Sequence, residues 1–346
     1  VKDSELHMLL ATRDGADLVQ AAVVARLQNS GRDLRGPSVL SIYAALNKIV
    51  TREILDPQPI PFQAVSLRYQ DEMHLQYPVF VKPSSASCSQ LGFKCKDEKE
   101  LHDALQKMRG EIPVFSAYLK PFLEEHLLLH SLPLSIVDGK RGPIALPPWV
   151  LDPGHSVLCE QFQPRSTFKV TVDGCVVATP AGHQIVLWGV SDNNYDRRPG
   201  GEYAAVFDNV TFPSRFYDAP SGSTDAPSLW AHEELRVVDK LQRRYKEIAR
   251  RMIALGFENQ FLDAEFFVEV DLEGLDIRST ALRKDRVVIR LMEVNSRMFP
   301  QMAPVYQASL HSGNQYEALI QVLLGAHFEG DVDVESDRCA ACSLLA

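Results

Sequence analysis

The sequence predicts an α/β protein of the α+β type, large enough for two or three subdomains. Strand-like apolar runs lie at residues 77–83, 157–162, 261–268 and 287–297. Apolar residues at helical spacing predict amphipathic helices at residues 97–108 and 228–255. The chain has 346 residues, of which 45% are hydrophobic and 23% charged, and this composition is ordinary for a globular protein with a sizeable core.

The first elements along the chain are predicted from their apolar patterns. Residues 7–12 predict a strand, and residues 15–28 predict a helix whose apolar residues recur every three or four positions. Residues 41–55 predict a second helix, which the proline-rich residues 56–61 end.

A lysine and a loop of small residues follow in the next part of the chain. Lys82 stands near the end of the first strand-like run, residues 84–92 are mostly small, and a helix follows at residues 97–108. The backbone amides of such a loop can surround an oxyanion, and the lysine adds a positive charge. It is not a Walker A loop, because the chain contains no G-x-x-x-x-G-K-[ST] motif. The pattern indicates phosphate binding, although a serine-rich loop after a strand is also typical of a solvated turn.

The middle of the chain alternates strands with polar or proline-rich segments. Loops are expected at residues 139–153, 191–201 and 213–227. Residues 167–178 predict a hairpin with its turn at Asp173 and Gly174. The helix at residues 228–255 is expected to end at Gly256, the usual capping position.

Polar side chains interrupt the last two strand-like runs. Glu265 lies in the first of them, and Glu293, Asn295 and Arg297 alternate along the second, so these three share one face. Two carboxylates and an amide oxygen suit Mg²⁺, and an arginine beside them suits a phosphate or acyl phosphate. A salt-bridged edge strand is the alternative interpretation.

The remaining C-terminal segments are predicted as connections and a tail. Residues 271–285 form a polar insertion that predicts an extended hairpin. A final helix is predicted at residues 316–324, and the acidic residues 329–337 predict a frayed tail. The pair Cys339 and Cys342 forms a single C-x-x-C, whereas a zinc site would need a second pair or nearby histidines.

Charge and cysteine usage exclude some classes of function. The chain has 36 Lys and Arg against 45 Asp and Glu, and the resulting net charge of −9 disfavours general nucleic-acid binding. No apolar run approaches the roughly 18 residues of a membrane span. Most of the six cysteines are scattered, which indicates reduced thiols and a cytoplasmic protein.

Taken in order, these segments resemble the ATP-grasp superfamily, and within it the carboxylate–amine ligases, over residues 36–325. The resemblance implies an ATP-grasp fold with two α+β subdomains that grip ATP, and ATP and Mg²⁺ (or Mn²⁺) as cofactors. It implies nucleotide binding by Lys48, Lys82, Ser84, Ser85, Ser87, Ser89, Glu160, Gln161, Phe162 and Lys169. It implies Glu265, Glu293 and Asn295 as metal ligands, and Lys82 and Arg297 as catalytic residues.

Some of these assignments have alternatives. Lys48 lies within a predicted helix, where lysine is an ordinary surface residue, and Lys169 could be a solvated strand residue. Residues 157–162 resemble the family's hinge strand, whose backbone is expected to recognise adenine, so the backbone of Glu160 matters more than its carboxylate. The chain departs from the family pattern because residues 163–167 lack the glutamate expected for the ribose. Serine also replaces most of the glycine expected in residues 84–92.

The resemblance also implies a domain organisation. The expected parts are a remnant of an N-terminal α/β domain at residues 1–37, an entry segment at 38–76, a lid subdomain at 77–180, a C-terminal subdomain with the metal site at 181–328 and a tail at 329–346. A homodimer and a longer parent chain are both compatible with this organisation.

The function that the resemblance implies is an ATP-dependent ligase. A small-molecule carboxylate would attack the γ-phosphate of ATP, and a small-molecule amine would then attack the acyl phosphate. A small-molecule kinase, suggested by Lys169, and a non-catalytic nucleotide-binding module are the alternative functions.

Overall fold

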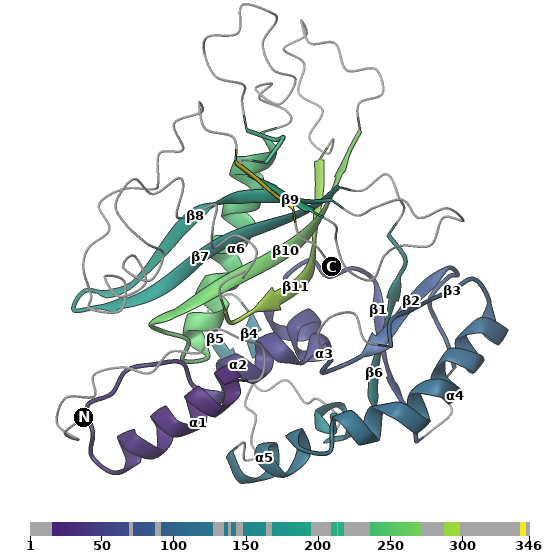
Figure 1. Ribbon diagram of the computed structural model, residues 1–346, viewed down its shortest axis with the longest axis horizontal. Coiled ribbons are helices and arrows are strands. Elements are labelled where there is room, and N and C mark those ends of the chain that lie inside the picture. Colours follow the sequence, from purple (N-terminus) through teal and green to yellow (C-terminus); the bar gives the residue numbers. More distant parts are fainter. Residues whose placement is uncertain are drawn as a thin grey trace, which may run out of the picture. The chain divides into compact units, whose positions relative to one another are not determined.

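In the computed structural model (Figure 1), the chain forms two compact units. Unit 1 comprises Val1–Gln163, Arg250–Glu258 and Glu293–Ser296, and unit 2 comprises Pro164–Ala249, Asn259–Met292 and Arg297–Ala346. The structure describes residues 16–68, 72–86, 91–126, 135–137, 140–142, 148–163, 168–194, 209–212, 214–217, 236–271, 287–297 and 340–343. The predicted α+β fold class is confirmed, since the described residues combine helices with antiparallel sheets.

The N-terminal helices of unit 1 are α1 (Ala16–Asn29), α2 (Val39–Leu46), α3 (Lys48–Val50) and a π-helical turn, η2 (Thr51–Leu55). The helix predicted at residues 15–28 is confirmed as α1. The single helix predicted at residues 41–55 is wrong, because Asn47 adopts an extended conformation and divides it. The Asn47 side chain accepts hydrogen bonds from the N–H groups of Ile49 and Val50 and so starts a new helix.

A four-stranded antiparallel sheet forms the second part of unit 1. Its strands lie in the order β1 (Phe62–Ser66), β6 (Ser156–Gln161), β2 (Val79–Pro83) and β3 (Phe93–Cys95). Leu101, Met108 and Ile112 of α4 (Glu98–Phe115) pack in the core of this sheet. The side chain of Asp97 caps α4 by accepting a hydrogen bond from the N–H of Glu100. The sequence predicted this helix but placed its end seven residues too early, at 108.

The rest of unit 1 contains short elements: α5 (Leu119–His126), β4 (Ser135–Val137), β5 (Lys140–Gly142) and the 3-10 helix η3 (Pro148–Leu151). The strand β5 and the helix η3 both lie in residues 139–153, so the loop predicted there is wrong over those residues. Strand β4 pairs with β5 as a two-stranded sheet.

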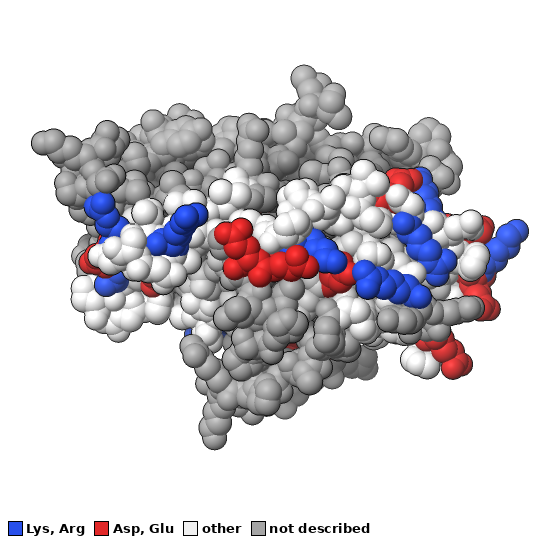
Figure 2. All heavy atoms as spheres, turned by 90° about the horizontal axis from the view of Figure 1, so that it is seen from below, with Lys and Arg blue, Asp and Glu red and all other residues white. Residues whose placement is uncertain are grey.

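Surface charges of both signs lie close together in the described residues. Figure 2 shows lysine and arginine side chains beside aspartates and glutamates on the face in view. On α4, for example, Glu100 lies 3.8 Å from Lys96, and both side chains are exposed. An exposed pair of this kind adds little stability.

The main sheet of unit 2 has six strands in the order β11-β10-β7-β8-β9-β12. The strands are β7 (Phe168–Thr179), β8 (Gly182–Asn194), β9 (Asn209–Phe212), β10 (Gln260–Val270), β11 (Val287–Asn295) and β12 (Ala340–Ser343). The last three residues of β11 fall in unit 1. Strand β8 extends through residues 191–194, and β12 lies within the expected tail, so both segments are more regular than the sequence predicted.

The hairpin turn predicted at Asp173 and Gly174 is wrong. Strand β7 continues through both residues and pairs with β8 as far as Thr179 and Gly182, so the turn lies between those two. The register shifts between Asp173 and Gly174, as in a β-bulge. The Asp-Gly pair therefore marks an irregularity within a strand, which is the other meaning of an isolated strand glycine.

Helix α6 comprises Val237–Ala254, and its residues up to Ala249 belong to unit 2. This part of α6 covers one face of the sheet of unit 2 (Figure 1). Leu241, Tyr245 and Ile248 are fully buried, and the Tyr245 hydroxyl donates a hydrogen bond to the carbonyl of Leu262 on β10 (2.8 Å). The predicted cap at Gly256 is confirmed by its φ of 91°. Residues 228–235 of the predicted helix lie outside the described residues.

Several other predictions also fall outside the described residues. They are the strand at 7–12, the loop serines Ser87 and Ser89, most of the insertion at 271–285, the helix at 316–324 and the acidic tail at 329–337.

Candidate nucleotide and metal site

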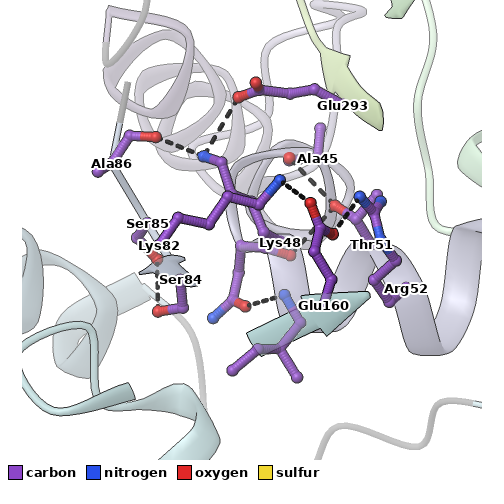
Figure 3. Close-up of polar contacts among 12 residues, drawn as sticks. Ala45, Lys48, Thr51, Arg52, Lys82, Ser84, Ser85, Ala86, Glu160 and Glu293 are labelled. Carbon is purple, nitrogen blue, oxygen red and sulfur yellow. Dashed lines mark hydrogen bonds and ion pairs between the residues drawn. The ribbon is translucent and has the colours of Figure 1, made fainter. Parts of the chain in front are cut away.

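Lys82 is held in the interior of unit 1 by a carboxylate on the neighbouring strand. The Lys82 Nζ lies 2.8 Å from Glu160 Oε1, and strands β2 and β6 are paired there. The other carboxylate oxygen, Glu160 Oε2, accepts a hydrogen bond from Arg52 Nη2 at 2.9 Å. Figure 3 shows Glu160 between the two cations. Glu160 and Arg52 are 4% and 1% exposed, so water screens these charges little.

Burial and charge act in opposite directions on this cluster. Burial would raise the pKa of the Glu160 carboxyl, but the charges and hydrogen bonds of Lys82 and Arg52 outweigh it and hold the pKa below its usual value of 4.5. Burial lowers the pKa of Lys82 from 10.5, and the charge of Glu160 opposes that effect. Glu160 is therefore a carboxylate at neutral pH.

Lys48 is a second buried lysine beside Lys82. It opens α3, where it is 6% exposed, and its Nζ donates a hydrogen bond to the carbonyl of Ala86. The same Nζ lies 3.2 Å from Glu293 Oε1 (Figure 3). The structure thus excludes the alternative that Lys48 is an ordinary surface residue, because the new helix that starts after Asn47 carries it inward.

The start of the small-residue loop is built into unit 1. The Ser84 N–H donates to the Ser156 carbonyl, and the Ser84 carbonyl accepts from the Lys48 N–H at 2.7 Å. The Ser84 hydroxyl lies 2.5 Å from the Ser156 hydroxyl, and Ser84 is fully buried. Ser85 is partly exposed, with its hydroxyl 3.5 Å from that of Ser84. Of these two serines, Ser85 has more freedom to contact a ligand.

The backbone groups of the hinge residues Gln161 and Phe162 already form hydrogen bonds within the chain. The N–H of Gln161 donates to the Pro61 carbonyl, and the N–H of Phe162 donates to the Pro78 carbonyl. The Gln161 carbonyl accepts a hydrogen bond from the side chain of Gln163. Adenine recognition by the backbone of these residues, which the sequence predicts, stays a prediction and would require some of these contacts to be exchanged.

The predicted metal ligands belong to both units. Glu265 lies on β10 in unit 2 and is 8% exposed, whereas Glu293 and Asn295 lie at the end of β11 in unit 1. Strands β10 and β11 are neighbours in the sheet order. In unit 2, Arg297 Nη1 lies 3.5 Å from Asp263 Oδ2. The metal site itself stays a prediction.

Lys169 lies on β7 in unit 2, with its Nζ 5.7 Å from the centroid of the Phe267 ring on β10. This distance is typical of a cation–π contact. Lys169 therefore has a structural partner on the sheet.

Two features of the candidate site were missed in the sequence. The first is Arg52, which lies four residues after Lys48 and is fully enclosed. The second is the carboxylate of Glu160, which was assigned a role only through its backbone. A charged residue within an apolar helix or strand was the available signal, since such a residue is rarely buried without a partner.

Solved structures of other proteins resemble the fold of this chain. The biotin carboxylase of Campylobacter jejuni, solved as a β-γ-ATP complex, gives a TM-score of 0.59 at 15% identity, over 98% of this chain and 59% of that one. The L-amino acid ligase of Bacillus licheniformis gives a TM-score of 0.54 at 15% identity, over 95% of this chain and 62% of that one. The chain has the ATP-grasp fold.

A further ATP-grasp structure agrees with this result. It is the biotin carboxylase domain of the 2-oxoglutarate carboxylase of Hydrogenobacter thermophilus, in complex with MgADP, ADP and bicarbonate. Its TM-score is 0.57 at 13% identity, over 97% of this chain and 58% of that one. At such identities the likeness establishes the ATP-grasp fold alone. This chain spans about three fifths of the length of each of these three proteins.

Comparisons of sequence give no further information. No protein-family model matches the chain, and no curated protein matches it either. In the described part of the chain, no helix is both long and apolar enough to cross a membrane.

The residues present fit a nucleotide and a magnesium ion. Among the described residues, Lys48, Lys82 and Arg52 form ion pairs with Glu160 and Glu293, so basic groups gather where the phosphates of a nucleotide could bind. The described residues contain no group of three or more His, Cys, Asp or Glu side chains that could hold a metal alone. Magnesium needs only one or two protein carboxylates when phosphates complete its shell, so two glutamates and an asparagine suffice.

Proposed function

We propose that the protein is an ATP- and Mg²⁺-dependent ligase that joins a carboxylate to an amine through an acyl phosphate and releases ADP and phosphate. The observation that carries this proposal is the buried pair Lys48 and Lys82, ordered by Glu160 and Glu293 in a chain with the ATP-grasp fold. Two enclosed lysines are suited to the phosphates of a nucleotide.

Lys48 would exchange its carboxylate partner when the nucleotide binds, whereas Lys82 would keep its own. Phosphate oxygens would replace Glu293 at Lys48, which would release the Glu293 carboxylate for the metal. Lys82 would stay oriented by Glu160, since Arg52 holds the second oxygen of that carboxylate. Positioned cations of this kind stabilise the charge that develops on the transferred phosphoryl group.

In this proposal the metal is held by Glu265, Glu293 and Asn295. A magnesium ion bound there supplies charge neutralisation to the phosphates. Arg297 would then contact the phosphoryl group once it is on the substrate, because a guanidinium suits the acyl phosphate oxygens. Asp263, 3.5 Å from Arg297, would orient the guanidinium in the meantime.

The experiment that tests the reaction is trapping of the acyl phosphate. Carboxylic acids are first screened with ATP and Mg²⁺ for ADP release in the presence of candidate amines. The productive acid is then incubated with ATP, Mg²⁺ and hydroxylamine but without the amine. A ligase gives the hydroxamate of the acid together with ADP. A stable phosphate ester from a hydroxyl substrate, without hydroxamate, would instead establish a kinase, and the absence of both products would indicate a nucleotide-binding module.

The metal ligands are tested with isosteric variants. Glu265→Gln and Glu293→Gln each remove one charge from the proposed site with little change in volume, so turnover should fall at least about 100-fold. The control is Glu124→Gln, because Glu124 is exposed on α5 and should leave turnover unchanged. Wild-type rates in both active-site variants would show that the metal assignment is wrong.

A further inference from the structure

The last residues of β11 are held at both ends by the N-terminal helices of unit 1. Residues Glu293–Ser296 belong to unit 1 together with α1, α2 and α3. Lys48 of α3 lies 3.2 Å from Glu293, at the start of this segment. Asp17 of α1 accepts a hydrogen bond from the hydroxyl of Ser296, at the end of the segment. Two residues of the helices therefore fix the segment that carries Glu293 and Asn295.

Ser296 directly follows Asn295, the last residue of β11. Hydrogen bonds between strands fix the backbone only as far as the strand continues, so the position of Asn295 depends on what holds the chain just after it. Val294 and Ser296 are 2% and 3% exposed, whereas Glu293 and Asn295 are only partly buried. Ser296 therefore alternates with the proposed metal ligands and points to the enclosed side of the segment.

The buried hydroxyl of Ser296 needs a hydrogen-bond partner, because burying it unbonded would cost free energy. Oδ2 of Asp17 accepts from this hydroxyl, and Oδ1 of Asp17 accepts from the N–H of Leu18 at 2.9 Å. Asp17 is itself only 5% exposed. A hydrogen bond to a carboxylate is stronger than one between neutral groups. Asp17 is thus well suited to fix the direction of the Ser296 side chain.

Helix α1 keeps the carboxylate of Asp17 in place. Asp17 lies in the first turn of α1, where the helix dipole favours a negative charge. Leu18, Ala21 and Val24 of the same helix are buried, and α1 packs against α2. Because α2 leads into α3, one packed group of helices carries both Asp17 and Lys48.

A bound nucleotide would affect the two contacts differently. In the proposed function, phosphate oxygens replace Glu293 at Lys48, and this exchange frees the Glu293 carboxylate for the metal. Asp17 and Ser296 are both enclosed, so their hydrogen bond is not exchanged. It would keep Asn295 in position while Glu293 moves from the lysine to the metal.

We propose that Asp17 is a positioning residue for the metal site: through Ser296 it holds the end of β11 so that Glu293 and Asn295 can bind the metal together. This inference rests on the proposed function. It gives α1 a part in the reaction, although the sequence indicated this helix only as the remnant of another domain. Magnesium demands near-ideal octahedral geometry, so a small displacement of one ligand weakens its binding.

The test is the binding of Mn²⁺, a paramagnetic substitute for Mg²⁺, to the full chain with a non-hydrolysable ATP analogue. The EPR signal of free Mn²⁺ measures the affinity without turnover. Ser296→Ala removes one hydroxyl with little change in volume, so the fold should be retained. We expect this variant to bind Mn²⁺ about threefold to tenfold more weakly, as for the loss of one hydrogen bond. At saturating Mn²⁺ it should bind the analogue as tightly as the wild type, because excess metal compensates for a weaker metal site but not for a damaged fold.

A double-mutant cycle assigns the effect to Asp17. Asp17→Ala should weaken Mn²⁺ binding at least as much as Ser296→Ala does, and the double variant should lose no more than Asp17→Ala alone. The control is Ser116→Ala, because Ser116 is a buried serine of unit 1 whose hydroxyl donates to the carbonyl of Ile112 at 2.8 Å. This variant should keep an Mn²⁺ affinity within about twofold of the wild type.

The outcomes for these variants decide the inference. An Mn²⁺ affinity of Ser296→Ala within about twofold of the wild type would overturn it, even if the melting temperature falls, since the hydrogen bond would then serve stability alone. Additive losses in the double variant would overturn it as well, because Asp17 would then act independently of Ser296.

Glu293→Gln separates this inference from the proposed function. If Glu293→Gln weakens Mn²⁺ binding and Ser296→Ala does not, only the inference fails. If Glu293→Gln binds Mn²⁺ as the wild type does, the metal assignment fails and the inference fails with it. Weaker Mn²⁺ binding in Ser296→Ala and Asp17→Ala supports the inference even if no acyl phosphate is trapped, in which case the ligase reaction alone would fail.

Discussion

Glu160 forms ion pairs with two cations in the interior of unit 1. Lys82 and Arg52 each contact one of its carboxylate oxygens, and all three residues are largely enclosed. A buried ion pair adds little net stability compared with apolar packing, but the loss of one partner leaves an uncompensated charge. The stability of this region therefore depends on the intact cluster more than on any single contact.

The first prediction is that Glu160→Gln strongly destabilises the protein. The glutamine keeps the shape of the side chain but leaves Lys82 and Arg52 without the negative charge between them, at a cost of about 3–5 kcal/mol. Urea unfolding at neutral pH measures the difference from the wild type. Glu124→Gln on the exposed surface of α5 is the control and should change stability by less than about 0.5 kcal/mol.

The second prediction concerns how the difference in stability between the wild type and Glu160→Gln depends on pH. The pKa of Glu160 in the folded protein lies below 4.5, so the stability that its charge contributes is fully present above pH 4.5. It is lost as the pH falls through the folded-state pKa, because the protonated carboxyl no longer balances the cations. The gap between wild type and Glu160→Gln should stay constant from about pH 7 to about pH 5 and narrow below that range. A gap that widens on acidification would contradict the assigned ion pairs.

Among the elements of the fold, β7 shows how a single residue fixes a strand. Gly174 lies at the bulge, where a Cβ atom would stand 2.1 Å from the carbonyl oxygen of Val186 and 2.8 Å from the Tyr245 hydroxyl. The first of these atoms belongs to the backbone of the neighbouring strand and cannot move aside without disturbing the sheet. The glycine thus permits close approach of β7 and β8 under α6.

The third prediction follows from this close approach. Gly174→Ala should cost about 3 kcal/mol or more, because the methyl group overlaps the backbone of β8. Gly110→Ala is the matched control, since Gly110 lies in α4 and a Cβ there meets nothing within 4 Å. That variant should be more stable than the wild type by about 0.5–1 kcal/mol, through the higher helix propensity of alanine. Equal melting temperatures for the two variants would contradict the strand register.

At the scale of the whole molecule, a bound nucleotide should stabilise the chain. A ligand that binds only the native state stabilises it by mass action, by about 2.7 kcal/mol at 100 times its dissociation constant. The fourth prediction is therefore that Mg²⁺ with a non-hydrolysable ATP analogue raises the melting temperature. Lys82→Met should reduce the shift at the same ligand concentration, because it removes a proposed phosphate contact. A shift of the same size in both proteins would exclude Lys82 from the nucleotide site.

Much of the architecture was predictable from local patterns in the sequence. The amphipathic helices at α1, α4 and α6 and the apolar strands β2, β6, β10 and β11 follow from periodicity, which depends only on neighbours in the chain. The order of lysine, small-residue loop, hinge strand and polar strand ends predicted the ATP-grasp fold. These features can be read from short stretches of sequence, because a strand or helix buries one defined face whatever it packs against.

Only the tertiary structure decided which polar groups are partners. Asn47 breaks a helix that propensity alone would continue, and that break carries Lys48 to Glu293 across 245 positions of the chain. Glu160 finds Arg52 across 108 positions, and Asp173 lies opposite Asp263 through the pairing of β7 with β10. Such contacts depend on the free energy of bringing distant segments together and on charge burial, and neither is recorded in the pattern of any one segment. The sequence therefore determined the fold and the candidate residues, whereas the ion pairs were decided by packing.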